Sequence, residues 1–196
     1  MRKPLLSILI PTVPSRADKF LPSILAQLAP QIEALTIVEL LYLGDNKLMS
    51  VGEKRNTLVN IASGEYVVFV DDDDRIAPNY VQRLIDGITY RDADKISPDC
   101  VCFDAEITQN GGAPAPVYYS KNNMRDTNHA NCYLRIPNHL MCVKRSLALD
   151  TPYLEINRGE DSEYAKRLLP KLKVEHKLNE VLYYYDFNSQ TTEAQK

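Results

Sequence analysis

Apolar runs and amphipathic stretches alternate through residues 5–88, and this alternation is the feature that most limits how the chain can fold. Apolar, β-forming runs predict strands at 5–10, 36–43 and 66–70. Apolar residues at helical spacing predict helices at 18–28, 52–62 and 78–88. Strands that alternate with helices in this way form a parallel sheet that helices cover on both faces.

Local signals define the ends of the first two helices. Pro30 lacks a backbone N–H and is expected to prevent the helix at 18–28 from continuing. Ser63-Gly64 is expected to form a left-handed cap after the helix at 52–62, in which Leu58, Ile61 and Ala62 would face the core. Each helix is therefore expected to connect two neighbouring parallel strands.

The second half of the chain predicts a mixed or antiparallel extension of the sheet. Further β-forming runs predict strands at 100–107, 117–120, 139–143 and 181–185. The segment from 121 to 138 is expected to be irregular, and a helix at 160–169 is expected to end at Pro170. With 196 residues, the chain suffices for one α/β domain with a full-sized core.

Composition and charge exclude several other classes of protein. The chain is 44% hydrophobic and 25% charged with only 7 glycines, which excludes disordered, collagen-like and coiled-coil proteins. Its net charge of −3 provides no global basic field for nucleic acid or an anionic membrane. No apolar run approaches the roughly 20 residues of a membrane span. We expect a soluble, cytoplasmic protein whose four cysteines stay reduced and pack mostly in the core: Cys100, Cys102, Cys132 and Cys142.

Four consecutive aspartates, Asp71 to Asp74, directly follow the third predicted strand. Ligands of open α/β sheets bind outside the carboxyl ends of the strands, where Asp45 also lies after the second strand. Four carboxylates cannot all be ionised in a cramped, dry site unless a cation offsets their repulsion. Mg²⁺ or Mn²⁺ held by one or two carboxylates and by substrate phosphates would suit this loop. A solvated acidic turn is the simpler alternative.

The residues around this acidic loop resemble family 2 glycosyltransferases. The segment Ser63-Gly64-Glu65-Tyr66-Val67-Val68-Phe69-Val70-Asp71-Asp72-Asp73-Asp74 is similar to that family's G-E-Y segment ending in D-x-D-D. Ile10-Pro11-Thr12, Gly52-x-x-Arg55-Asn56 and Gly159-Glu160-Asp161 follow the family's order. The resemblance implies a GT-A fold, with a Rossmann-like, mostly parallel central sheet flanked by helices and a mixed or antiparallel C-terminal extension. It implies one domain over 1–196, with a nucleotide-sugar-binding half at 1–98 and an acceptor-binding half at 99–196.

The resemblance also implies roles for individual residues. Asp71 and Asp73 match the first and last positions of the family's D-x-D motif and would hold the metal, Mn²⁺ or Mg²⁺. Asp161 matches the family's general base, which deprotonates the acceptor hydroxyl. Donor binding is assigned to Pro11, Thr12, Arg16, Asp45, Arg55, Asp71 and Asp72. The assignments of Asp45, Arg55 and Asp161 each have a structural alternative, such as the favourable placement of Glu160 and Asp161 in the first turn of a helix.

The function that the resemblance implies is metal-dependent, inverting sugar transfer from a nucleoside-diphosphate sugar, with a UDP-sugar favoured. One group must then take a proton while another neutralises the charge on the leaving phosphate. The acceptor is a hydroxyl of unknown class, a saccharide or, as a minority hypothesis, nucleic acid such as a hydroxylated DNA base. Tyr118, Tyr119 and Tyr133 are candidates for stacking on it.

Two other functions remain open. A strand that ends in D-x-D also begins haloacid-dehalogenase-like phosphatases, although there the motif follows the first strand. A nucleotide-sugar-binding module without turnover would keep the same fold, because fold alone does not establish activity. No role is assigned to His129, His139 or His176.

Overall fold

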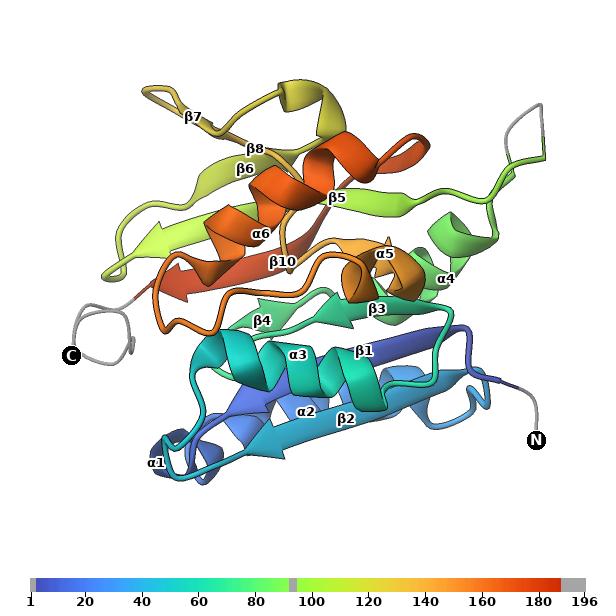
Figure 1. The fold of residues 1–196 in the computed structure, drawn as a ribbon. Coiled ribbons are helices and arrows are strands. Elements are labelled where there is room, and N and C mark those ends of the chain that lie inside the picture. The colour runs from blue at the N-terminus through green and yellow to red at the C-terminus, as the bar shows by residue number, and fades with distance from the viewer. Residues whose placement is uncertain (1–2, 92–94, 188–196) are drawn as a thin grey trace.

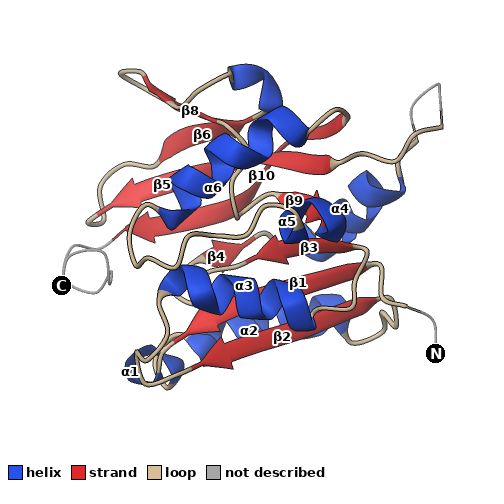
Figure 2. Cartoon of the chain, viewed as in Figure 1, coloured by secondary structure: helices blue, strands red, loops and turns tan. Residues whose placement is uncertain are grey.

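The computed structural model describes residues 3–91 and 95–187, in which ten strands form one sheet with helices on both of its faces (Figures 1 and 2). Helices α3, α5 and α6 lie on the near face in Figure 1, and α2 and α4 lie behind it. The strands are β1 (Leu6–Thr12), β2 (Val38–Gly44), β3 (Tyr66–Phe69), β4 (Arg75–Ile76), β5 (Cys100–Gln109), β6 (Ala115–Tyr119), β7 (Thr127–Asn128), β8 (Tyr133–Arg135), β9 (Cys142–Lys144) and β10 (Glu175–Phe187). The helices are α1 (Pro14–Ala17), α2 (Leu21–Ile32), α3 (Val51–Ile61), α4 (Tyr80–Thr89), α5 (Arg145–Leu149) and α6 (Glu160–Leu168), with short 3₁₀ turns at Lys121–Asn123 and Leu169–Lys171.

The first three strands are parallel, as the strand–helix alternation predicts. β1 lies between β2 and β3, with Leu6 opposite Val38 on one side and Tyr66 on the other. Because β1 has a neighbour on each side and helices on both faces, almost all of its side chains are buried, which explains its continuous apolar sequence. The carboxyl ends of the three strands therefore lie at the same edge of the sheet.

The second half forms the predicted mixed extension. β5 pairs with β6 in antiparallel and with β10 in parallel orientation, while β9 runs antiparallel to both β3 and β5. β9 thereby joins the two halves into one sheet. β10 also pairs with the two-residue β4 that follows the acidic loop, so the last strand reaches back to the first half.

The end of α2 differs from the prediction. Pro30 lies inside the helix rather than beyond its end, and α2 continues to Ile32. A proline there removes one backbone hydrogen bond near the end of the helix. Hydrogen bonds of the Gln31 side chain hold this turn in place, because Gln31 donates to the carbonyl of Ala77, just before α4, and accepts from the amide of Val81 in α4. Tertiary contacts thus override the local signal.

The end of α3 also differs. Its C-cap residue, Ala62, has an extended backbone, and Gly64 does not adopt a left-handed conformation. Gly64 is needed instead for a close approach, since a Cβ there would lie 2.5 Å from the hydroxyl of Ser7. Ile61, expected to face the core, is 56% exposed, whereas Leu58 and Ala62 are buried as predicted.

Other predictions in the second half need smaller corrections. The strand expected at 139–143 is the shorter β9, because residues 139–141 form the loop that leads into it. The segment expected to be irregular contains β7 and β8, and α5 was not predicted. Cys100, Cys102 and Cys142 are buried free thiols as expected, and Cys132 is half-buried.

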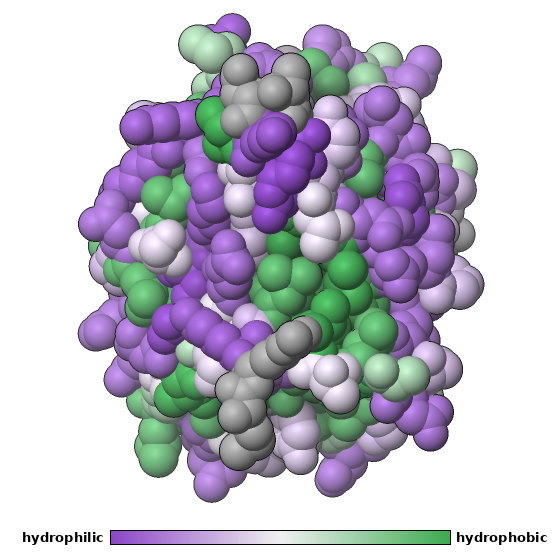
Figure 3. All heavy atoms as spheres, turned by 90° about the vertical axis from the view of Figure 1, so that its right-hand side faces the viewer, coloured by the Kyte–Doolittle hydropathy of each residue, from purple (hydrophilic) through white to green (hydrophobic). Residues whose placement is uncertain are grey.

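The two ends of the sheet differ in character. The acidic loop follows the carboxyl end of β3, and Figure 3 shows the face at the opposite end, where hydrophobic residues gather within a hydrophilic surface. In the part of the chain that the structure describes, no helix is long and apolar enough to cross a membrane.

Candidate active site

The carboxyl edge of β1, β2 and β3 gathers most of the residues that the sequence singled out. Thr12 ends β1, Asp45 follows β2, and the acidic loop (Asp71–Asp74) follows β3. Arg16 lies in α1, directly after β1, and Arg55 lies in α3, between β2 and β3. Residues far apart in the sequence therefore lie at one edge because the strands are parallel.

Arg16 bridges two of the four aspartates. Its guanidinium donates to Oδ1 of Asp72 at 2.6 Å from Nη2 and 3.0 Å from Nε, and Nη2 lies 2.5 Å from Oδ1 of Asp73. The hydroxyl of Thr12 donates to the other oxygen of Asp72 at 2.5 Å. Asp72 is thus a buried anchor for the loop, and an arginine supplies part of the positive charge that the sequence analysis ascribed to a metal.

Asp71 contacts a different arginine. Arg55 Nη2 donates to Asp71 Oδ1 at 3.0 Å, and Nε2 of His139 lies 3.3 Å from Oδ2. Burial alone would raise the pKa of Asp71, but Arg55 and His139 outweigh it and hold this pKa well below its usual range. Asp71 is therefore an ionised carboxylate whose side chain remains 28% exposed.

Asp74 contacts Tyr183 of β10. The Tyr183 hydroxyl donates to Asp74 Oδ2 at 2.6 Å and accepts from the backbone amide of Asp71 at 3.0 Å. Burial, together with the charges of Asp71 and Asp73, raises the pKa of Asp74 well above its usual value. Tyr183 thus fixes the shape of the loop from the last strand.

Asp45 is held by a buried lysine. It accepts from the amide of Met49 at 2.7 Å and forms an ion pair with Lys54 of α3. Lys54 also donates to the carbonyl of Thr12 at 2.7 Å. The Lys54 hydrogen bond lowers the pKa of Asp45, although burial opposes the shift. Asp45 therefore helps to attach the end of β2 to the end of β1.

Arg55 connects the acidic loop to the start of α6. Its Nε lies 3.6 Å from Oε1 of Glu160, the first residue of that helix. Gly159 precedes it with φ +77°, a left-handed conformation that glycine adopts without strain. Asp161 follows Glu160 and accepts from the amide of Ser162. The charge of Asp161 also contributes, with those of the acidic loop, to the raised pKa of Tyr185, for which burial is the largest cause.

Helix α3 also holds the segment that leads into α6. Asn56 and Tyr153 exchange two hydrogen bonds, one from Asn56 Nδ2 to the Tyr153 carbonyl at 2.9 Å and one from the Tyr153 amide to Asn56 Oδ1 at 2.7 Å. The amide of Gly52 donates to the carbonyl of Ile156, and a Cβ on Gly52 would lie 1.8 Å from the carbonyl oxygen of Leu154. Gly52 and Asn56 of this motif therefore attach α3 to the segment that leads into α6.

The four aspartates of the acidic loop outnumber the two arginines that contact it, Arg16 and Arg55. Burial and the charges of Asp71 and Asp72 raise the pKa of Asp73, although Arg16 opposes the shift. Within 3–91 and 95–187 no cluster of three or more His, Cys, Asp or Glu side chains could hold a metal by itself. Mg²⁺ is normally held by only one or two carboxylates and completes its shell with phosphates and water. Asp71 and Asp73 are two carboxylates of a kind that such a metal would accept, and in this structure Arg55 and Arg16 contact them.

The structure thus brings six predicted residues together in two contacting groups that the acidic loop joins: Thr12, Arg16, Asp72 and Asp73 in one, and Arg55 and Asp71 in the other. Pro11 lies in β1 opposite Leu43, and Asp45 joins the group through Lys54. Asp161 is linked to the group only along the chain, through Glu160, whose carboxylate lies 3.6 Å from Arg55.

Four residues of this site have no role assigned from the sequence: Lys54, His139, Glu160 and Tyr183. Two sequence signals were present. Lys54 lies beside Arg55 in the same motif, and Glu160 precedes Asp161. His139 and Tyr183 come from the second half of the chain, so only the tertiary fold could show that they contact the acidic loop.

Comparison with known proteins decides the family. A model of the family described as "Glycosyl transferase family 2" matches residues 19–144, more than half of the chain. The chain belongs to this family. The match includes the acidic loop, Arg55 and His139, whereas Asp161 lies beyond its end.

Solved structures give the same fold for this family 2 chain. S. aureus TarS 1–349 matches with a TM-score of 0.65 and 17% identity over 93% of this chain and 60% of that one. The complex of TarS 1–349 with UDP-GlcNAc matches with a TM-score of 0.65 and 16% identity over 94% of this chain and 59% of that one. A197 from STIV matches with a TM-score of 0.51 and 13% identity over 94% and 86%.

These similarities have clear limits. The chain spans about six-tenths of the length of the TarS 1–349 structures, and identities this low establish the GT-A fold alone. No curated protein sequence matches the chain.

Proposed function

We propose that this family 2 chain is a metal-dependent, inverting glycosyltransferase that moves a sugar from a nucleoside-diphosphate sugar to an acceptor hydroxyl. The observation that carries the proposal is the position of Arg55, which contacts Asp71 of the acidic loop and Glu160 beside Asp161. The donor would then bind on the Asp71 side of the buried Arg55 guanidinium, and the acceptor on the Glu160 side. Residues 1–98 would bind the donor and residues 99–196 the acceptor.

The donor is a UDP-sugar in this proposal, because two of the similar structures are complexes of TarS 1–349, one with UDP-GlcNAc and one with UDP. Pro11, Thr12 and Asp45 would border the nucleotide at the edge of β1 and β2. Asp71 and Asp73 would hold Mn²⁺ or Mg²⁺, which when bound would neutralise the charge that develops on the leaving diphosphate. Arg16 and Arg55 lie beside these carboxylates and would orient the diphosphate.

Asp161 is the proposed general base. It would accept the proton of the acceptor hydroxyl while that oxygen bonds to the anomeric carbon and the bond from this carbon to the diphosphate breaks. Attack from the face opposite the leaving group inverts the configuration. A positioned base typically contributes about 10²–10⁴-fold to the rate.

Thermal unfolding with UDP, GDP, dTDP and CMP, each with and without Mn²⁺, tests donor binding. We expect a Mn²⁺-dependent rise in Tm with UDP, since a ligand at about 100 times its Kd stabilises a protein by roughly 2.7 kcal/mol. Asp73→Asn should weaken this effect. The absence of a shift with all four nucleotides would contradict the proposal and favour a phosphatase.

The assignment of Asp161 needs a separate test. Asp161→Asn should keep the UDP-dependent rise in Tm and lose sugar transfer, measured as release of UDP from a UDP-sugar in the presence of an acceptor. Transfer by this variant at the wild-type rate would exclude Asp161 as the base. Donor binding without turnover by the wild-type protein would favour the non-catalytic module.

A further inference from the structure

His139 lies in the loop that leads into β9 and reaches the acidic loop from the second half of the chain. Its Nε2 lies 3.3 Å from Oδ2 of Asp71, and its side chain is 8% exposed. Neither the sequence nor the proposed function gives this histidine a role. What it does must therefore follow from its contacts.

The backbone around His139 is fixed on both sides. Its carbonyl accepts from the amide of Phe69, the last residue of β3, at 3.2 Å. Asn138 closes the turn that follows, because its side chain accepts from the amide of Leu140 at 3.1 Å and its carbonyl accepts from the amide of Met141 at 3.2 Å. The main chain thus holds the imidazole of His139 where it is.

The polar contact of the His139 ring is with Asp71. Nδ1 of the ring is buried and, among the residues that the structure describes, has no hydrogen-bond partner. A carboxylate that is ionised, as Asp71 is, can only accept hydrogen bonds, so Nε2 carries a proton and donates to Oδ2. The effect of the imidazole on the site therefore passes through Asp71.

Two donors hold the two oxygens of the Asp71 carboxylate. Arg55 Nη2 donates to Oδ1 at 3.0 Å, and His139 contacts Oδ2. Arg55 belongs to α3 in the first half of the chain, and His139 belongs to the second half. Each carboxylate oxygen has two lone pairs, so one donor on each oxygen fixes the orientation of the group and leaves capacity for a ligand. The Asp71 side chain is 28% exposed and can offer that capacity at the surface of the site.

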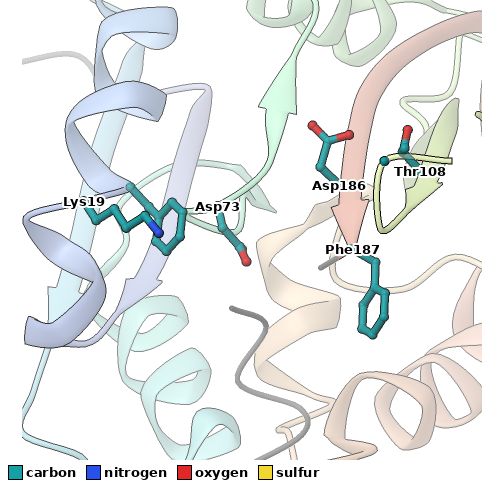
Figure 4. A pocket seen from close by; sticks show the side chains of 7 residues that line it. Lys19, Asp73, Thr108, Asp186 and Phe187 are labelled. Carbon is teal, nitrogen blue, oxygen red and sulfur yellow. The ribbon is translucent and has the colours of Figure 1, made fainter. Parts of the chain in front are cut away.

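His139 is not placed to touch a ligand directly. A cavity of about 310 Å³ lies beside the acidic loop, and Figure 4 shows Asp73 on one side of it and Thr108 and Asp186 on the other. His139 is buried and is not among the described residues that line this cavity. A ligand in the cavity would therefore meet carboxylates of the site and not the imidazole.

We propose that His139 is a positioning residue for sugar transfer, which holds Oδ2 of Asp71 so that this carboxylate is oriented for the donor's Mn²⁺ or Mg²⁺. The inference rests on the proposed metal-dependent function. Carboxylates that bind metals are themselves hydrogen-bonded, and loss of such an outer partner typically costs about 10–100-fold in metal affinity. A residue of the half assigned to the acceptor would thus complete the donor side of the site.

Equilibrium dialysis with tritiated UDP at increasing Mn²⁺ concentrations tests the inference. The quantity compared is the Mn²⁺ concentration that gives half of the maximal UDP binding. His139→Leu removes the donor to Asp71, and we expect it to raise this concentration about tenfold or more. His139→Gln keeps an N–H at a similar distance from Cβ and should stay within about threefold of wild type. His139→Asn carries the same amide on a shorter side chain and should behave like His139→Leu.

A matched control is available in His176, which is half-buried and stacks on Tyr90 with ring centres 4.1 Å apart. His176→Leu also removes an imidazole and should need the same Mn²⁺ concentration as wild type. Unfolding in urea without ligand shows whether each variant is folded. If His139→Leu does not fold, the comparison of His139→Gln with His139→Asn decides.

The outcomes separate this inference from the proposed function. Equal Mn²⁺ requirements of wild type and His139→Leu would overturn the inference alone. Equal requirements of His139→Gln and His139→Asn would also overturn it, because these two amides differ in reach and not in chemistry. Wild-type protein that binds no UDP, or binds it independently of Mn²⁺, would overturn the proposed metal-dependent function and the inference with it.

Discussion

Arg55 Nη2 lies 3.0 Å from Asp71 Oδ1, so a buried guanidinium neutralises the first carboxylate of the acidic loop. The same guanidinium lies 4.9 Å from the centre of the Phe69 ring and 6.0 Å from that of Tyr153. Asp71 and Glu160 raise the pKa of Arg55, against the effect of burial, which lowers it. Arg55 therefore stays charged and links the end of β3 to the start of α6.

Replacement of Arg55 should be costly. Removing one partner of a buried ion pair typically destabilises a protein by about 3–5 kcal/mol, because the other charge is left without compensation. We expect Arg55→Ala to lower the free energy of unfolding by about 3 kcal/mol at pH 7, measured in urea. Arg83→Ala is the control, since Arg83 forms ion pairs at the surface with Asp86 and Glu180 and should change stability by less than about 1 kcal/mol.

The Arg55–Asp71 pair should also depend on pH. The folded-state pKa of Asp71 lies below the unfolded value of about 3.9, so its stabilising effect is complete above that pH and declines as the pH falls through the folded pKa. The difference in stability between wild type and Arg55→Ala should therefore shrink below about pH 4. A difference that stays constant down to pH 3 would contradict this account of the pair.

Asp74 should show the opposite dependence. Its folded-state pKa is raised, so its contribution is fully present below the unfolded pKa and is lost as the pH rises through the folded pKa. Asp74→Asn keeps an oxygen that can accept from Tyr183 and carries no charge. We expect this variant to gain stability relative to wild type between pH 5 and pH 8, measured by urea unfolding. A parallel pH dependence of the two proteins would show that Asp74 is ionised without cost.

The sequence predicted the sheet better than the details of the site. Periodicity was enough for the parallel strands, because strands buried on both faces must be continuously apolar. The local rules for helix ends failed at Pro30 and Gly64. Hydrogen bonds from Gln31 hold the last turn of α2, and the close approach of Ser7 requires a glycine at position 64. Such contacts join residues that are distant in the sequence, so local rules do not contain them.

The same reason explains what was missed in the acidic loop. The four aspartates are identical in the sequence but have different environments in the fold. Asp72 is an anchor for Thr12 and Arg16, Asp74 faces Tyr183, and Asp71 contacts Arg55 and His139. The sequence could show that the loop is acidic, and only the folded chain shows which carboxylates keep some exposure.

The two hydrogen bonds between Asn56 and Tyr153 predict an effect of Asn56 on the position of α6. Asn56→Ala would leave the buried amide and carbonyl of Tyr153 without their partners, at a cost of about 1–3 kcal/mol. Because these two hydrogen bonds hold the segment before α6, we expect kcat to fall about tenfold or more while the Kd for UDP stays within about twofold. Asn60→Ala, at an exposed position on the same helix, is the control. Equal losses of donor binding and kcat would show general unfolding instead of mispositioning.

The contacts of Arg16 with two aspartates predict how tightly the site binds Mn²⁺. Because its guanidinium already contacts Asp72 and Asp73, Mn²⁺ without nucleotide must compete with a positive charge in place. We expect Mn²⁺ alone to bind weakly to wild type and several-fold more tightly to Arg16→Gln, measured by the loss of the free Mn²⁺ electron paramagnetic resonance signal. Arg83→Gln lowers the net charge equally and should bind Mn²⁺ like wild type. Equal Mn²⁺ affinity in Arg16→Gln and wild type would show that Asp73 is not where the metal binds.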